Sequence, residues 1–238
     1  MLHSWRNGHA KLDAYLDDYA ALANSLVSLY EANFKERWID DAVQLIDIVL
    51  DKFADPTGGG FFYTASDHEQ LIARTKELTD SSTPSGNSLA ANVLLRLGRL
   101  LGRADHLDAA EQILAAAVPI MQRAPTATGQ MLLALDLYMG PKNELVLVGD
   151  MARDDTKQAI ASVHRRHLPR SVFAARDTRS ADPTGSQSGH LNEIFEGKES
   201  PDGQPVLYVC ENFACSAPAV GLAQIESRLE QFGRHKDD

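Results

Sequence analysis

The segment Trp38-Ile39-Asp40-Asp41-Ala42-Val43-Gln44-Leu45-Ile46 returns 68 residues later in weakly matched form, as His106-Leu107-Asp108-Ala109-Ala110-Glu111-Gln112-Ile113-Leu114. In both copies the apolar residues recur every three or four positions, which is the spacing of one helix face. A second apolar stripe precedes each copy, from Leu12 to Leu29 in the first case and from Leu89 to Leu100 in the second. We therefore predict two helical hairpins that form a structural repeat.

A long excursion, from Asp55 to Thr83, separates the two hairpins. Within it, Phe61 to Thr64 and Leu71 to Arg74 are β-prone runs that we expect to pair as a small sheet. An excursion of this length suggests a functional role. One more helix is predicted from about Thr128 to Tyr138, because the Gly140-Pro141 pair that follows cannot continue it.

The pattern changes after residue 140, so we predict a helical unit over 1–140 and a small α/β element over 141–238. Strand Glu144 to Val148, a helix from Asp154 to His167 and strand Ser171 to Ala174 predict one β-α-β unit. A polar loop at about 176–204 precedes a further strand and a last helix. The alternation of strands and helices predicts a parallel sheet. The strand that follows the polar loop is Val206 to Cys210, and the last helix runs from about Pro218 to Phe232.

Composition excludes several classes of function. The 238 residues are 44% hydrophobic and carry a formal charge of -10, which repels nucleic acid and anionic membrane surfaces. No run approaches the roughly 20 apolar residues that span a bilayer, and Asp13 lies where a signal peptide would have its apolar stretch. We expect a cytoplasmic protein without nucleic-acid or membrane partners.

The first candidate site joins the starts of the two hairpins. In the repeat alignment, Asp17 and Asp18 correspond to Ser85 and Gly86, and Asn87 follows. In a closed ring of helical hairpins, equivalent ends lie on one face, so Asp18 and Asn87 are expected to line one cavity. Asp17 and Asp18 are the catalytic candidates, because a carboxylate can act as an acid, a base or an acceptor of sugar hydroxyls. The alternative is helix capping, which the same residue types favour.

Charged residues lead into this second helix start. Lys76, Glu77 and Asp80 precede Pro84-Ser85-Gly86-Asn87-Ser88, and charge beside a glycine turn can bind a polar ligand. We therefore take as ligand-binding candidates Lys76, Glu77, Asp80, Ser85, Gly86 and Asn87. The alternative is a solvated loop.

The two cysteines give a second hypothesis. Cys210 ends a strand and Cys215 lies ahead of the last helix, whose positive end favours a thiolate. Against a redox pair, four residues separate them, no basic residue is adjacent, and Glu211 would raise a nearby thiol pKa. Cysteine is also a common buried residue. We expect no metal and no cofactor, because two thiols do not make a closed zinc site and the histidines lack metal-binding spacing.

Several motifs resemble the C-terminal part of the spermatogenesis-associated protein 20 family, whose bacterial members are described as thioredoxin-domain-containing proteins. They run in order from about Trp5 to Leu229. The resemblance implies a mainly α fold, a partial (α/α)6 toroid of the six-hairpin glycosidase class, related in architecture to N-acylglucosamine 2-epimerase. It also implies a carbohydrate-related function. The motifs are Asp17-Asp18-Tyr19-Ala20, Tyr30-Glu31-Ala32, Trp38, Gly58-Gly59-Gly60-Phe61-Phe62, Lys76-Glu77 with Asp80, Pro84-Ser85-Gly86-Asn87-Ser88, Tyr208-Val209-Cys210-Glu211-Asn212-Phe213-Ala214-Cys215 and Pro218.

The chain departs from the family at its front. Full-length members resemble a thioredoxin-like domain followed by the first hairpins of the toroid, and the family's thioredoxin-type cysteine motif is absent here. We therefore expect a truncated or split product, or a missing half supplied by another chain. Three functions follow as alternatives. They are a toroid half that binds or modifies a sugar, a non-catalytic scaffold that forms homo-oligomers or needs a partner chain, and a thiol module that uses Cys210 and Cys215.

Overall fold

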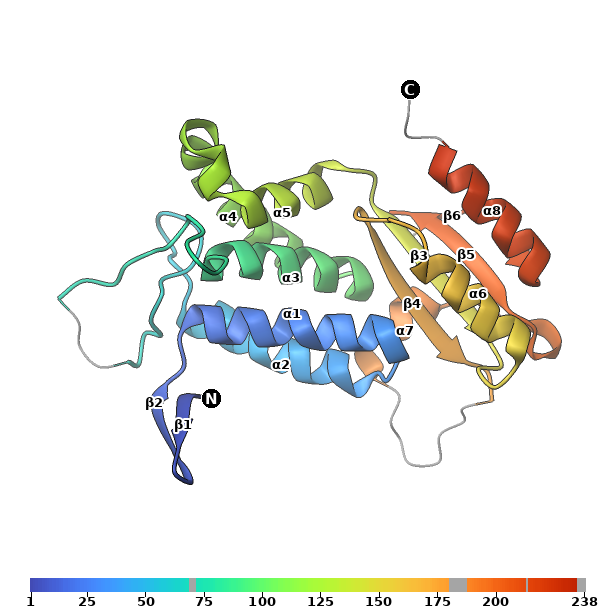
Figure 1. Cartoon of the computed structure of the whole chain (residues 1–238), viewed down its shortest axis with the longest axis horizontal. Helices are drawn as coiled ribbons and strands as arrows, with labels where there is room; N and C mark the ends of the chain where they lie inside the picture. Colours follow the sequence, from blue (N-terminus) through green and yellow to red (C-terminus); the bar gives the residue numbers. More distant parts are fainter. Residues whose placement is uncertain (69–71, 180–187, 213, 235–238) are drawn as a thin grey trace. The chain divides into compact units, whose positions relative to one another are not determined.

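The computed structural model describes residues 1–68, 72–179, 188–212 and 214–234. The chain divides into two compact units, Met1–Gly140 and Pro141–Asp238 (Figure 1). The first consists of helices with a small hairpin, and the second is built around a sheet. Each unit has its own buried core.

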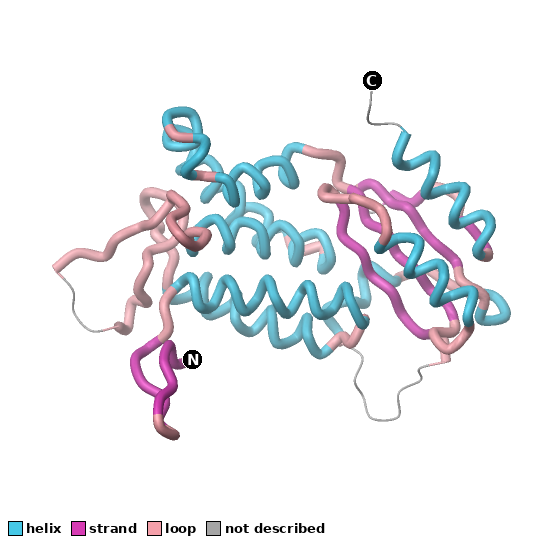
Figure 2. Tube along the Cα trace, in the orientation of Figure 1, coloured by secondary structure: helices cyan, strands magenta, loops and turns pink. Residues whose placement is uncertain are grey.

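The first unit contains two helical hairpins and one further helix. Helix α1 packs against α2 and α3, while α3 also packs against α4 and α5, so α3 is the central helix of the unit (Figure 2). Both predicted hairpins are confirmed, as is the helix after Thr128. The elements are α1 (Leu16–Asn33), α2 (Arg37–Lys52), α3 (Gly86–Leu101), α4 (Ala104–Arg123) and α5 (Gly129–Met139).

Local chemistry fixes the ends of the central helix. Ser85 caps α3, because its hydroxyl accepts a hydrogen bond from the Ser88 N–H at 3.2 Å. Gly102 ends the helix with a φ of 67°, a left-handed conformation that a glycine adopts without steric cost. Between these ends, Leu94, Leu97 and Leu100 are fully buried. The apolar face of α3 therefore forms part of the core of the unit.

An exposed hairpin precedes α1. Strands β1 (Leu2–Arg6) and β2 (His9–Asp13) pair antiparallel across a two-residue turn. Asn7 and Gly8 make the turn with φ values of 52° and 80°, as a type I′ turn requires. The apolar stripe predicted from Leu12 therefore begins to be helical only at Leu16.

The excursion between the hairpins contains no strand in its described part. Phe61 forms an isolated antiparallel bridge with Ala54, and Tyr63 N donates to Thr75 O at 2.8 Å. The small sheet predicted there is therefore absent from the described residues, and Leu71 of the second run lies outside them.

The second unit has a five-stranded sheet. Strands β3 and β4 pair parallel and are joined by α6, which confirms the predicted β-α-β unit. Helix α8 packs on α6 and β7. Part of the polar loop, 180–187, lies outside the described residues. The elements are β3 (Asn143–Gly149), α6 (Asp154–His164), β4 (Ser171–Asp177), α7 (Asn192–Phe195), β5 (Val206–Glu211), β6 (Ala214–Cys215), β7 (Ala219–Val220) and α8 (Leu222–Arg234).

The sheet is mixed, so the predicted parallel sheet is wrong. Strand β5 runs antiparallel to β3, with Val206 opposite Val148. β5 therefore begins beside the C-terminal end of β3. A parallel β5 would instead have to begin at the opposite end of β3.

The predicted fold class, a mainly α partial toroid, is also wrong. The mixed sheet is a substantial part of the structure, and all seven residues of its central strand β3 are buried. The periodicity of residues 1–140 indicates helices but not their closure into a ring, which came from the resemblance alone. Among the described residues, no helix is both long enough and apolar enough to cross a membrane.

Candidate functional site

The first unit has a cleft where α1 and α3 begin, with a volume of about 500 Å³. The two helix starts approach closely because Gly86 has no side chain. A Cβ at Gly86 would lie 2.9 Å from Leu16 Cγ and 3.0 Å from Asp17 N. We call this hollow the Asp17 cleft; its lining residues are Asp17, Asp18, Ala21, Asn24, Ser25, Thr83, Pro84 and Leu89.

Asp18 fixes the start of α1. Its Oδ2 accepts a hydrogen bond from Tyr15 N at 3.0 Å and lies 2.7 Å from His3 Nδ1. A carboxylate at the third helical position that bonds the backbone N–H of the capping residue satisfies an otherwise orphan donor. Asp18 therefore both caps the helix and forms part of the cleft wall.

Asp17, unlike Asp18, has a buried carboxylate oxygen, Oδ1, to which no described residue donates a hydrogen bond. Burial raises the pKa of Asp17 above its usual value, and the neighbouring negative Asp18 adds to the increase, while hydrogen bonds from the backbone of Asp17 and Asp18 oppose it. A carboxylate with unused acceptor capacity and a raised pKa can accept a ligand hydroxyl or exchange a proton with it.

Aromatic rings lie next to Asp17. Tyr15 and Tyr63 stack with centroids 4.7 Å apart, and Leu16 N donates to Tyr63 O at 3.0 Å. Burial, aided by the charge of Asp17, raises the pKa of the Tyr63 phenol to about 12. The His68 ring lies 5.5 Å from Tyr15, and neither of its buried nitrogens has a described hydrogen-bond partner.

Asn87 is fully buried and does not line the Asp17 cleft. Its Oδ1 accepts from Phe61 N at 2.8 Å, and its amide donates to Phe61 O at 2.9 Å and Glu77 O at 3.0 Å. Asn87 therefore anchors the long loop to α3. The expected shared cavity of Asp18 and Asn87 is not formed.

Asp80 connects the loop to two helices. Its carboxylate accepts from Ser85 N at 3.0 Å and Ser88 Oγ at 3.2 Å, both at the start of α3. Its other oxygen accepts from Gln130 N at 2.9 Å, at the start of α5. Negative charge at two helix N-termini is favourable. Asp80 thus positions Thr83 and Pro84, which form part of the cleft wall.

Lys76 also has partners within the protein. Its ammonium forms an ion pair with Asp55, and it donates to Gly59 O at 2.7 Å. The hydrogen bond from Lys76 keeps the pKa of Asp55 well below its usual range. Glu77 is exposed, and its backbone oxygen receives the Asn87 amide. The ligand-binding role of Lys76, Glu77, Asp80, Ser85, Gly86 and Asn87 stays a prediction.

The structure brings Asp17 and Asp18 together with polar residues that the sequence analysis missed. Asn24 Nδ2 donates to Leu89 O at 2.7 Å, which joins α1 to α3 along the cleft. Asn24 and Ser25 each follow one of the two aspartates by seven positions, so each pair lies on the same helix face. That spacing is the sequence signal that could have identified them.

Cys210 and Cys215 form a disulfide between neighbouring strands β5 and β6. Cys210 is 2% exposed, whereas Cys215 is exposed. The structure therefore pairs the two thiols that the sequence singled out. No group of three or more histidine, cysteine or acidic residues able to hold a metal exists among the described residues.

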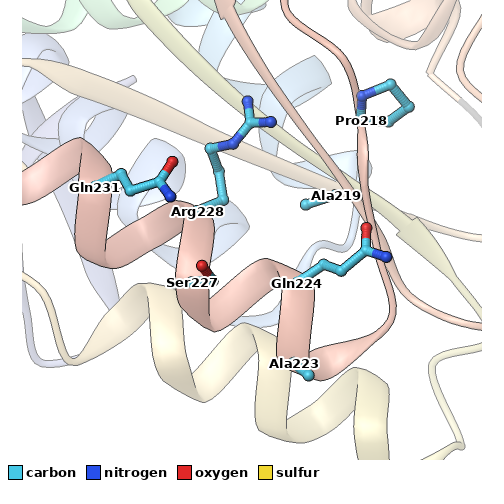
Figure 3. Close-up of a pocket in the computed structure, with 7 residues that line it drawn as sticks. All are labelled: Pro218, Ala219, Ala223, Gln224, Ser227, Arg228 and Gln231. Atoms are coloured by element: carbon cyan, nitrogen blue, oxygen red, sulfur yellow. The ribbon is translucent and has the colours of Figure 1, made fainter.

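A second hollow of about 360 Å³ lies along α8 (Figure 3). Arg228 Nη1 donates to Ser216 Oγ at 2.7 Å, and Gln224 Oε1 accepts from Val220 N at 3.0 Å. Both side chains thus fasten α8 to the edge of the sheet. Its lining residues are Pro218, Ala219, Ala223, Gln224, Ser227, Arg228 and Gln231.

Sequence comparison finds relatives over most of the chain, although no family model matches it. Spermatogenesis-associated protein 20 of Homo sapiens is 33% identical over 216 residues, which are 90% of this chain and 27% of that protein. The Rattus norvegicus protein of the same name is 33% identical over 218 residues, 91% of this chain and 27% of the relative. An uncharacterised Caenorhabditis elegans protein is 27% identical over 94% of this chain and 30% of its own length. The chain thus spans less than a third of these relatives.

Proposed function

We propose that this chain, which belongs to the spermatogenesis-associated protein 20 family over nine-tenths of its length, binds a small carbohydrate in the Asp17 cleft. The observation that carries the proposal is the buried carboxylate oxygen of Asp17, which lacks a hydrogen-bond donor in a cleft of ligand size. A buried acceptor without a donor is costly unless a ligand or water satisfies the group.

The lining of the cleft suits a neutral, hydroxyl-rich molecule. Asp17 and Asp18 supply acceptors for sugar hydroxyls, and the Thr83 hydroxyl can donate or accept. The Ser25 hydroxyl already donates to Ala21 O at 2.8 Å, so it offers a further acceptor. Pro84 and Leu89 offer apolar surface for the C–H face of a sugar ring. The volume lies within the range of small-molecule sites. A ligand that carries a carboxylate or phosphate is disfavoured by the two aspartates.

Binding is the proposed activity, and Asp17 is the residue suited to proton transfer on the bound sugar. Asp18 is already engaged by Tyr15 N and His3. Glycoside hydrolysis commonly needs two carboxyl groups about 5–9.5 Å apart on opposite sides of the bond. Asp17 and Asp18 are adjacent in one helix, so they share one side of the cleft and do not form such a pair.

The test is a thermal-shift titration of the chain with glucose, N-acetylglucosamine and maltose. A ligand that binds only the folded state raises the melting temperature with its concentration. We expect at least one of the sugars to do so with the wild type and not with Asp17→Asn. Asp41→Asn is the matched control, because it removes the same charge from an exposed position on α2. If no sugar stabilises the wild type, or if Asp17→Asn responds equally, the proposal fails.

A further inference from the structure

The disulfide lies in a tight hairpin of the second unit. Glu211 pairs with Ala214 next to the turn, and Ser216 N donates to Val209 O at 3.0 Å. Cys210 and Cys215 face each other between the pair Glu211–Ala214 and the pair Val209–Ser216. In antiparallel strands such a pair is not hydrogen-bonded and its Cα atoms lie closer together. Their Cα separation is 3.8 Å.

The sheet is expected to form without this covalent bond. The cysteines are five positions apart, and backbone hydrogen bonds close the same hairpin on both sides of them. A cross-link that closes so short a loop removes less chain entropy from the unfolded state than one that closes a long loop. We therefore expect the pair to open and close without unfolding the sheet.

The two sulfurs differ in access. Cys210 is 2% exposed, and Cys215 is exposed on the edge strand β6. We therefore expect an incoming thiolate to reach Cys215 rather than Cys210. The sulfur that is attacked keeps the incoming group, and the other sulfur leaves. Cys215 is the exchanging cysteine by this argument, and Cys210 is the one that re-forms the bond.

Charged groups share the sheet face that carries Cys210. Glu144 lies opposite Cys210 in the β3–β5 register and is 1% exposed, while Glu211 points to the other face because side chains alternate along a strand. Lys198 interacts with Glu144 and Glu196 and lies 6.0 Å from the ring centroid of Tyr208, which is two residues along β5 from Cys210. The negative Glu144 disfavours a lasting thiolate at Cys210, and the positive Lys198 attracts anionic thiols.

We propose that Cys210 and Cys215 form a thiol–disulfide exchange site whose substrate is a small anionic thiol of the glutathione class. A substrate thiolate bonds to Cys215 Sγ, the Cys210–Cys215 bond breaks, and Cys210 leaves with the electron pair and is protonated. A second substrate thiolate then attacks the substrate sulfur of the mixed disulfide. Cys215 leaves as a thiolate, and the substrate disulfide is released. Two electrons thus pass from two substrate thiols to the protein disulfide.

Equilibration of the full chain in buffers of reduced and oxidised glutathione tests the exchange. Maleimide labelling after an acid quench, followed by intact-mass measurement, counts the free thiols. We expect zero-label and two-label species that interconvert reversibly as the glutathione ratio changes. A chain that stays fully oxidised or fully reduced across the accessible ratios overturns the proposal.

Single variants test the assigned roles. With oxidised glutathione, Cys210→Ser is expected to form a lasting mixed disulfide at Cys215 and to release one reduced glutathione. Cys215→Ser is expected to react at least about tenfold more slowly, because Cys210 is buried. Equal rates for the two variants contradict the assignment. Circular dichroism of both variants checks that the sheet is intact. A loss of the sheet without these cysteines would show that the bond is structural and also overturns the proposal.

Lys198→Gln tests the electrostatic part. It is expected to slow mixed-disulfide formation with glutathione about threefold and to leave the rate with neutral 2-mercaptoethanol unchanged. Lys157→Gln, which removes an exposed charge from α6, is the matched control. If Lys198→Gln and Lys157→Gln form the mixed disulfide with glutathione at the same rate, Lys198 does not attract the substrate.

Discussion

Gly86 leaves no room for a side chain beside the backbone of Asp17, at the point where α3 meets α1. A Cβ at Gly86 would lie 3.0 Å from Asp17 N and 2.9 Å from Leu16 Cγ, closer than side chains normally approach. The glycine thus permits the two helix starts to meet, and the Asp17 cleft lies at this meeting point.

Gly86→Ala is therefore expected to destabilise the first unit by about 1–3 kcal/mol, because the added methyl group must displace Leu16 or the backbone of α1. Alanine is the better helix former, so a packing clash is the reason for any loss. Gly189→Ala is the control, since a Cβ there meets nothing within 4 Å. Urea unfolding measures both. Equal stability of the two variants would mean that the helix starts separate readily.

Asp17→Asn is expected to raise the melting temperature by about 1–3 °C at pH 7, because it removes a charge that burial disfavours. The folded-state pKa of Asp17 is raised from its ordinary value of 3.8, so the folded chain holds this proton more tightly than the unfolded chain. Stability therefore falls as the pH rises through the window between the two pKa values. The gain of Asp17→Asn should shrink well below pH 3.8. A gain independent of pH contradicts the assignment.

Asn87→Ala is expected to cost about 2–4 kcal/mol of folding free energy, since three hydrogen bonds are lost and the buried N–H and C=O of Phe61 lose their partner. Chemical denaturation monitored by circular dichroism gives the value. Gln44→Ala, at an exposed position on α2, serves as the comparison. A loss no larger than that of Gln44→Ala would show that Asn87 does not anchor the loop.

Asp80→Ala is expected to loosen the loop before α3 and the start of α5 together, because one carboxylate serves both. Amide hydrogen exchange should accelerate at Ser85 and Gln130, the two residues that donate backbone N–H bonds to Asp80. Asp108→Ala, exposed on α4, should leave both rates unchanged. Faster exchange at only one of the two sites would show that the carboxylate does not couple them.

Periodicity predicted the helices of the first unit well, because each buries one apolar face. Leu94 and Leu97 on α3 and Ile46 on α2 are fully buried, as their spacing indicates. The hairpin at the N-terminus was not predicted. Its signal was present in Asn7-Gly8, a pair that favours the type I′ turn, but all residues of its strands are exposed and show no apolar alternation.

The arrangement of the elements could not be predicted from the sequence as well as the helices could. Helical repeats do not reveal whether hairpins close into a ring, and the sequence of the strand at Val206 does not indicate whether it runs parallel or antiparallel to its neighbour. Its antiparallel direction follows from where the chain returns after β4, which depends on the conformation of the long connection.

The candidate site was half predictable. Asp17 and Asp18 were identified from their place at a helix start, whereas Asn24 and Leu89 join the cleft through packing of α1 on α3. Asn87 was placed in the site by the same repeat alignment and is instead buried against Phe61. Alignment finds equivalent helix ends but not which way a side chain turns.

The central claim is that the Asp17 cleft is a ligand site, and amide chemical-shift mapping tests it most directly. The isotope-labelled chain is titrated with the sugar that gives the largest thermal shift, or with all three sugars if none does. We predict saturable shifts at the amides of Asp17, Asp18, Asn24, Thr83 and Leu89, absent in Asp17→Asn. Shifts confined to other residues, or none at saturating sugar, would contradict the account.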